Sequence, residues 1–131
     1  AGGTGLEGER FKHVKFSGLP VTDQDRAVAF YRDVIGLRLA TDQQYGSGWR
    51  WIELEIPGSP TRVLFERRES EAPGEQPTLN IVVEDVDAAY AVLLAKGVVF
   101  DQEPIDAPWA PAERYALLRD SEGNLILIGS G

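Results

Sequence analysis

The chain has 131 residues, a net charge of −8 and no cysteine. Its acidity argues against nucleic acid or an anionic membrane as a partner, because both bind basic surfaces. The lack of cysteine excludes disulfides, thiolate nucleophiles and cysteine-ligated metals. Since no apolar run approaches the roughly 20 residues that span a bilayer, we expect a cytoplasmic protein.

The polar, glycine-rich residues 1–10 are expected to form a disordered lead-in or to be an expression remnant. The first half of the chain then predicts a strand, a helix and three strands. The helix begins at a capping-box pattern, in which the hydroxyl of Thr22 precedes the carboxylate of Asp25 by three residues, and it ends at Gly36. The strands are expected at 11–21, 37–44, 49–56 and 61–67.

The second half repeats this order after a polar, proline-rich segment. Asp85 is the expected N-cap of its helix and Gly97 the expected end. The strands are expected at 78–83, 98–101, 113–119 and 125–128, with a proline-rich loop at 105–112. These patterns predict a first module at 11–68, a linker at 69–77 and a second module at 78–131.

The two halves also share sequence at a constant offset of 62 residues. The first copy, Val21–Ala29, reads VTDQDRAVA, and the second, Val83–Ala91, reads VEDVDAAYA. One valine, two aspartates and two alanines therefore recur in register. Two copies of one unit predict a pseudo-twofold body with a cleft between its halves.

The repeated order, the sequence VTDQDRAVAFYRDVIGL and the turn DSEGN before the last strand resemble the vicinal oxygen chelate superfamily. This group contains glyoxalase I, extradiol dioxygenases, and fosfomycin- and bleomycin-resistance proteins. The resemblance covers residues 11–129 and implies an α+β fold, in which two tandem βαβββ modules form curled mixed sheets around a cavity. In the metal-dependent members, four inward-facing His, Glu or Gln residues hold a divalent cation that acts as a Lewis acid.

Counting along these motifs places the four implied metal positions at Phe16, Phe65, Thr78 and Leu127. Only the threonine offers a donor atom, whereas a divalent ion needs several converging donors. The single histidine, His13, is expected on the opposite strand face from Phe16. Glu66 would turn inward only if the strand register slipped by one residue. We therefore predict no metal, no cofactor and no catalytic residue.

Aromatic and apolar side chains stand where the resemblance implies metal ligands, and they predict a ligand-binding cavity. The predicted lining residues are Phe16, Trp49, Trp51, Glu53, Phe65, Thr78, Trp109, Tyr115 and Leu127. Flat aromatic walls suit planar or cationic ligands through stacking and cation–π contacts, and Glu53 adds negative charge. The structural alternative is that the same side chains fill the cup as ordinary core.

The sequence thus predicts a metal-free protein of the bleomycin-resistance type, which binds and sequesters a small molecule such as a planar or cationic antibiotic. As in its relatives, the cavity is expected at a homodimer interface. Two alternatives stay open. One is a metal-dependent lyase or dioxygenase with displaced ligands, and the other is a structural or interaction module whose cavity is filled.

Overall fold

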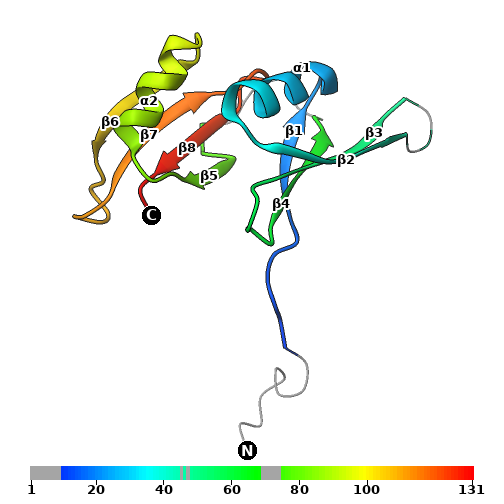
Figure 1. Ribbon diagram of the computed structural model, residues 1–131, viewed down its shortest axis with the longest axis horizontal. Coiled ribbons are helices and arrows are strands. Elements are labelled where there is room, and N and C mark those ends of the chain that lie inside the picture. Colours follow the sequence, from blue (N-terminus) through cyan, green and yellow to red (C-terminus); the bar gives the residue numbers. More distant parts are fainter. Residues whose placement is uncertain (1–9, 45, 47, 69–74) are drawn as a thin grey trace, which may run out of the picture.

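The computed structural model describes residues 10–44, 46, 48–68 and 75–131 and contains two four-stranded sheets (Figure 1). The first sheet, in the order β1-β4-β3-β2, consists of β1 (Phe16–Val21), β2 (Arg38–Gln44), β3 (Arg50–Glu55) and β4 (Arg62–Arg67). The second sheet, in the order β5-β8-β7-β6, consists of β5 (Leu79–Val82), β6 (Val99–Asp106), β7 (Arg114–Arg119) and β8 (Leu125–Gly129). The helices are α1 (Gln24–Val28), which continues as the π-helix η1 (Ala29–Ile35), and α2 (Val86–Ala95).

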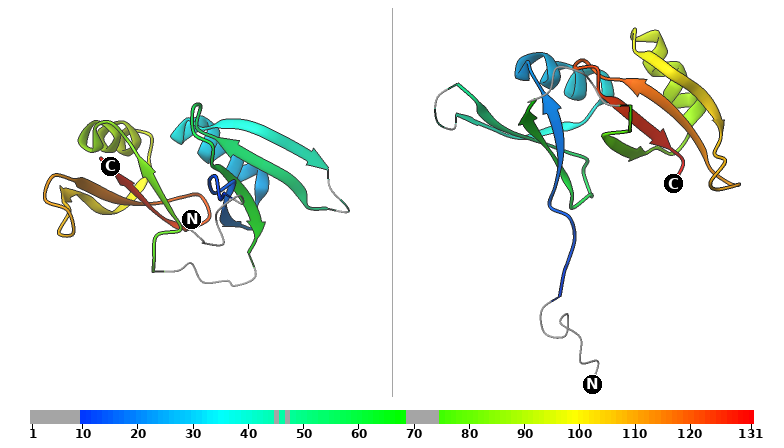
Figure 2. Two further views of the ribbon diagram at one scale, coloured as in Figure 1. Left: turned by 90° about the horizontal axis from the view of Figure 1, so that it is seen from below. Right: turned by 180° about the vertical axis from the view of Figure 1, so that it is seen from behind.

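Both sheets are mixed and follow one plan. In each, the first strand pairs parallel with the last, β1 with β4 and β5 with β8, and the other pairs are antiparallel. This confirms the predicted α+β class and the order of strand, helix and three strands in each half. The sheets lie side by side without closing into a barrel (Figures 1 and 2).

Some predicted segments lie partly outside the described residues. Of the expected lead-in only Arg10 is described, and of the expected linker only 75–77. The first strand starts at Phe16 rather than at residue 11, and the chain before it leads away from the body (Figure 1). The carbonyls of Val14 and Lys15 still accept hydrogen bonds from Thr61 and Arg62. Within the described ranges, neither helix combines the length and the apolar character needed to cross a bilayer.

The start of the first helix differs from the predicted capping box. The carboxylate of Asp23, rather than the hydroxyl of Thr22, accepts the capping hydrogen bond from the backbone N–H of Arg26 at 3.0 Å. The helix then widens into η1 and ends as predicted at Gly36, whose φ of 96° favours glycine. Asp85 caps α2 as predicted. The capping-box prediction is wrong because Thr22 bonds to the second module instead.

Strand alternation gives each sheet a helix-facing side and an open face. On the helix-facing side of the first sheet, Leu19, Ile52 and Phe65 are at most 2% exposed. The alternate side chains of this sheet form what we call the first open face, which carries Phe16, Trp51, Glu53, Leu64 and Glu66. The same alternation in the second sheet forms the second open face, which carries Asn80, Tyr115, Leu117 and Leu127.

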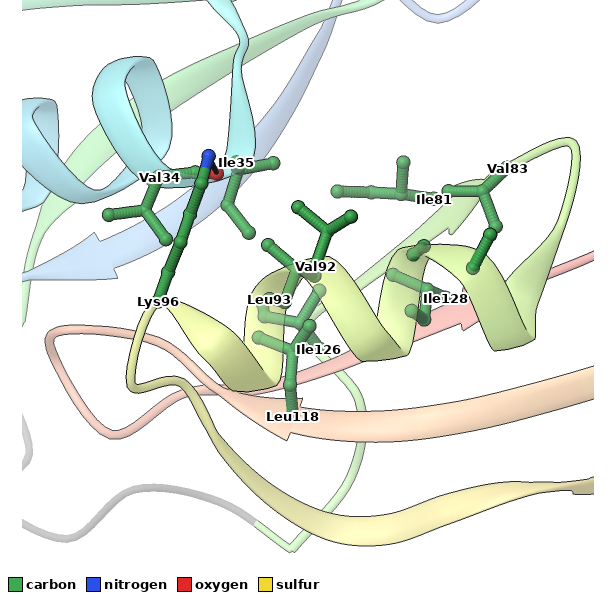
Figure 3. A pocket seen from close by; sticks show the side chains of 12 residues that line it. Val34, Ile35, Ile81, Val83, Val92, Leu93, Lys96, Leu118, Ile126 and Ile128 are labelled. Atoms are coloured by element: carbon green, nitrogen blue, oxygen red, sulfur yellow. Dashed lines mark hydrogen bonds between the residues drawn. The ribbon is translucent and has the colours of Figure 1, made fainter.

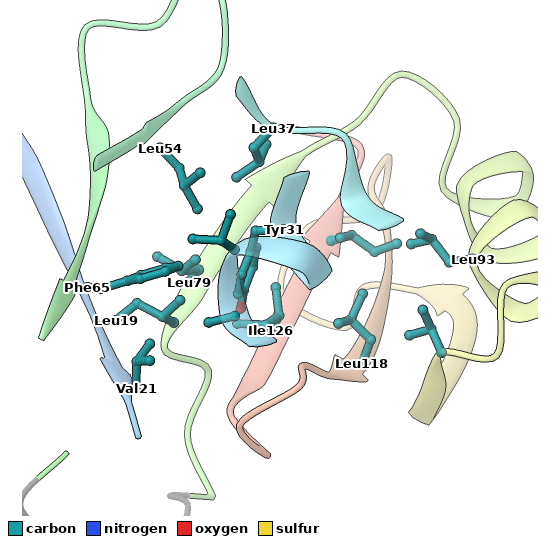
Figure 4. Packing of buried hydrophobic residues seen from close by; sticks show 14 of the residues in the cluster. Leu19, Val21, Tyr31, Leu37, Leu54, Phe65, Leu79, Leu93, Leu118 and Ile126 are labelled. Atoms are coloured by element: carbon teal, nitrogen blue, oxygen red, sulfur yellow. The ribbon is translucent and has the colours of Figure 1, made fainter. Parts of the chain in front are cut away.

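The first helix packs between the helix-facing sides of both sheets (Figure 4). Tyr31 is fully buried there, with its ring centroid 6.3 Å from that of Phe65 in the first sheet. Its hydroxyl donates to Asp120 of the second module. Leu118 and Ile126 from the second sheet belong to the same buried cluster. One core therefore serves both modules, and each open face turns away from the helix.

A buried carboxylate of the second module, Glu122, joins the two modules. It accepts hydrogen bonds from the backbone N–H and the hydroxyl of Thr22 at 2.9 and 2.8 Å, and from the N–H of Asp23 at 3.0 Å. Arg26 donates to both of its oxygens, at 2.8 and 3.1 Å. Burial alone would raise the pKa of Glu122, but the hydrogen bonds from Arg26, Asp23 and Thr22 outweigh burial and lower the pKa to about 2.

The turn that carries Glu122 makes further bonds to the first module. Asp120 accepts from the backbone N–H groups of Glu122 and Asn124, both at 2.8 Å, which confirms its predicted role as a turn former. The Asn124 amide donates to the carbonyl of Pro20 at 2.7 Å. Arg68 donates to the side-chain oxygen of Asn124 at 2.7 Å. The turn at 120–124 thus connects the second sheet to β1 and the first helix through hydrogen bonds.

We expect the Glu122→Gln variant to lose about 2–3 kcal/mol of unfolding free energy near neutral pH, because the folded state lowers the pKa of this carboxyl. A lowered pKa contributes stability that is full above the unfolded value of about 4.3 and is lost as the pH falls toward about 2. The difference from wild type should therefore shrink in acid. Urea unfolding across this pH range measures it.

The matched control is Asp33→Asn, which also removes one carboxylate from an ion pair. Asp33 pairs with Arg32 at 2.9 Å, but both side chains are about half exposed. Its loss should be about 0.5 kcal/mol or less. Equal losses in the two variants near neutral pH would contradict the role given to Glu122.

Candidate functional site

The first open face brings together three of the predicted site residues. Phe16 and Trp51 meet edge to face, with ring centroids 6.0 Å apart and planes at 78°. Glu53 lies beside them, and the Nε1–H of Trp51 donates to its carboxylate at 2.7 Å. This hydrogen bond fixes the indole orientation on the sheet, so that the face offers an ordered aromatic surface.

Glu53 is buried and accepts hydrogen bonds from two side chains of the same protein. The residue is only 8% exposed, and Arg62 donates to its second oxygen at 2.7 Å. Burial would raise the pKa of Glu53, but the hydrogen bonds from Trp51 and Arg62 outweigh it and lower the pKa. Its charge is therefore already balanced within the protein. Glu53 positions Trp51 and Arg62 rather than presenting a free negative charge.

The second open face carries a hollow of 360 Å³ that unites three further predicted residues. Trp109 and Tyr115 form one wall, with ring centroids 4.6 Å apart, and Leu127 lies on the same face. Asn80, which the sequence analysis did not select, also lines this hollow. Trp109 is 58% exposed. Glu113 and Arg114 line it as well, so aromatic and charged side chains share the hollow.

Phe65 is placed on the wrong face by the sequence analysis. It is 2% exposed and belongs to the core beside Tyr31, opposite the first open face. The strand pairing explains the error, because Gly18 pairs with Leu64 while its counterpart Asn80 pairs with Leu127. The last strands of the two modules therefore repeat at an offset of 63 rather than 62. Leu64 holds the open-face position that was assigned to Phe65.

Trp49 also lies apart from the two open faces. Trp49 precedes β3, packs against the core, and has the Arg67 guanidinium 5.0 Å from its ring centroid. The predicted alternation fails there because Trp49 lies outside the strand. Thr78 lines a separate hollow of 550 Å³ between β5 and the first sheet, which Ser17 and Val63 also line.

An apolar groove between the end of η1 and α2 was not predicted (Figure 3). It measures 320 Å³ and is lined by aliphatic residues such as Val34, Ile81 and Val92. Lys96 closes one end, where its ammonium donates to the carbonyl of Val34 at 3.2 Å. The sequence signal that could have indicated this groove is the strongly apolar sequence VDAAYAVLLA of α2. A helix this apolar leaves apolar side chains on its surface, and Val92 is 55% exposed.

The fold agrees with a comparison of the sequence with known protein families. The model of the Glyoxalase/Bleomycin resistance protein/Dioxygenase superfamily matches residues 10–128. The chain belongs to this superfamily. Among relatives of this glyoxalase-type chain is the protein YraH of Bacillus subtilis (strain 168), which is 33% identical over 120 residues, covering 84% of this chain and 91% of YraH.

Solved structures of the superfamily superpose well on this chain. TnmS3, an antibiotic binding protein from Streptomyces sp. CB03234, gives a TM-score of 0.78 at 32% identity, covering 91% of this chain and 95% of TnmS3. TioX from Micromonospora sp. ML1 gives a TM-score of 0.67 at 30% identity, covering 90% of this chain and 98% of TioX.

The superfamily's metal site does not fit the residues present here. With the register corrected, its four positions are Phe16, Leu64, Thr78 and Leu127. Hydrocarbon side chains and one hydroxyl do not supply the donors that a divalent ion requires. In the described part of the chain, no group of three or more His, Cys, Asp and Glu residues converges on a point. His13 lies exposed before β1.

We expect Arg62→Ala to lower the unfolding free energy by about 1–2 kcal/mol, because it leaves the Glu53 carboxylate with one donor fewer in a buried position. Urea unfolding near neutral pH measures the loss. Arg38→Ala is the control, since Arg38 pairs with Glu55 from a side chain that is 63% exposed. A loss as large in the control would contradict the structural role given to the Glu53–Arg62 pair.

Proposed function

We propose that this chain binds a planar small molecule that carries a cationic group, and that it sequesters the ligand without a metal. The observation that carries this proposal is the ordered pairing of Phe16 with Trp51 on the first open face, where Phe16 stands at a position at which the metal-dependent fold needs a donor atom. Aromatic faces attract planar and cationic groups through stacking and cation–π contacts. The similar protein TnmS3 is an antibiotic binding protein, which supports a small molecule as the ligand of this chain.

The proposal includes a cytoplasmic homodimer in which the first open face of one copy covers the second open face of its partner. Each open face lies on the side of its sheet opposite the described helices, so those helices leave both faces uncovered. Exposed apolar side chains accompany the hollow on the second open face, where Val82 is 66% and Trp109 58% exposed. Contiguous exposed apolar surface is characteristic of sites that another molecule covers.

We expect planar cations such as 9-aminoacridine to quench the intrinsic tryptophan fluorescence in a saturable titration. Trp51→Ala should weaken binding about tenfold or more, because it removes the ring on which the ligand stacks. Trp49→Ala is the matched control and should leave affinity unchanged, since Trp49 packs against the core and Arg67. Equal effects of both substitutions would contradict the location of the site.

Metal analysis of the same purified protein separates this proposal from an enzyme. A stoichiometric content of zinc, nickel, manganese or iron would overturn it in favour of a lyase or dioxygenase with displaced ligands. Unchanged fluorescence with every planar cation tried would favour a structural module.

Sedimentation equilibrium should show a dimer of the wild-type protein. We expect Val82→Asp to weaken dimerisation at least about tenfold, because it places a charge in a surface that the partner copy covers. Val99→Asp is the control, since Val99 is 64% exposed on β6, outside the hollow. A monomeric wild type, or equal weakening by both substitutions, would contradict the proposed arrangement.

A further inference from the structure

One carboxylate on the first open face rests in a notch that a glycine provides. A Cβ atom at Gly18 would lie 2.2 Å from Oε1 and 2.8 Å from Oε2 of Glu66. Real side chains do not approach this closely, so the carboxylate occupies space that only glycine leaves open at position 18. Glu66 is itself exposed and reaches this place from the neighbouring strand β4.

The other carboxylates of this face are balanced by arginine, whereas Glu66 is not. Glu53 pairs with Arg62, and Glu55 pairs with both Arg38 and Arg62. Among the described residues, no arginine, lysine or histidine lies within ion-pair distance of Glu66. By strand alternation Glu66 shares the open face with Trp51. A negative charge without a partner thus lies on the same face as the aromatic pair.

The second module builds the same position with the roles exchanged. Asn80 stands on β5 where Gly18 stands on β1, and Gly129 stands on β8 where Glu66 stands on β4. In each module a glycine on one strand adjoins a polar side chain on the next. A Cβ atom at Gly129 would lie 4.0 Å from the amide oxygen of Asn80. Both modules thus place one polar side chain near a glycine of the neighbouring strand, and only the first module brings the two into close contact.

We propose that Glu66 is the specificity-determining residue of the ligand site and selects ligands with a cationic group. This inference rests on the proposed function, and it replaces Glu53 as the predicted source of negative charge. The ligand ring stacks on Phe16 and Trp51, while its cationic group pairs with the Glu66 carboxylate. Because Gly18 holds the carboxylate in its notch, the position of the charge depends on glycine as well as on glutamate.

The experiment compares two probes of nearly equal shape by tryptophan quenching and calorimetry. Near neutral pH, 9-aminoacridine is a cation and acridine is largely neutral. Wild-type protein should bind the cation at least about tenfold more tightly, because a charge-assisted contact forms only with it. Glu66→Gln should lose most of this preference for the cation, with the affinity for acridine unchanged.

Gly18→Ala tests the notch without removing the charge. Its Cβ displaces the flexible end of Glu66, so this variant should also lose most of the preference for the cation. Glu84→Gln removes an equal charge from the exposed loop before α2 and should keep the wild-type preference. Circular dichroism and thermal unfolding confirm that each variant is folded.

The results distinguish a failure of the role given to Glu66 from a failure of the proposed ligand binding. Binding of both probes with equal affinity by the wild type, or a preference that survives in Glu66→Gln, overturns the role of Glu66 while aromatic binding stands. If Glu84→Gln also loses the preference for the cationic probe, the role of Glu66 is overturned as well, because the net charge of the protein then explains the effect. If wild-type protein binds neither probe, the proposed function fails and this inference fails with it.

Discussion

Tyr31 lies where the first helix meets both sheets, with its ring beside Phe65 and its hydroxyl donating to Asp120. Burial and the neighbouring carboxylate raise the pKa of this phenol, so it stays protonated and keeps donating. Glu122 binds the start of the same helix through Thr22 and Arg26. Separating the helix from the turn would leave this buried carboxylate without its donors, which costs free energy of folding. The helix and the turn therefore stabilise each other's position.

This packing determines where chemistry can occur. Because the helix occupies the space between the inner sides of the two sheets, the remaining surfaces are the outer, open faces. Each combines aromatic and apolar side chains with several polar ones, and the donors of a metal site are missing from the positions where the superfamily carries them. Phe16, Leu64 and Leu127 offer hydrocarbon contact and no donor atom, and the proposal of binding without a metal rests on this chemistry.

Charge on the first open face illustrates how strongly neighbours modify a residue's role. Glu53 and Glu66 are both glutamates on one face, yet Arg62 balances the first and no basic residue among those described pairs with the second. The unbalanced carboxylate favours a cationic ligand over a neutral one of the same shape more strongly than a carboxylate that an arginine already balances. Glycine at position 18 then decides where that charge rests.

Local sequence signals predicted the elements well because they depend on neighbours along the chain. Asp85 as a helix cap, Gly36 as a helix end and the repeat of strand, helix and three strands were all found as expected. Errors arose where a count crossed a turn or a strand end. Phe65 was assigned to the wrong face because the last strands repeat with one extra residue, and Trp49 because β3 begins one residue later.

The sequence by itself determined the order of the elements and the twofold repeat, since these follow from residue type and periodicity, and the resemblance of its motifs to a known family implied the fold class. Only the tertiary structure decided which carboxylates are paired and which residues share a face. Arg26 and Glu122 are 96 residues apart, and Tyr31 and Asp120 are 89 apart. Contacts at such separations leave no periodic trace, because they depend on how two sheets pack around one helix rather than on any local pattern.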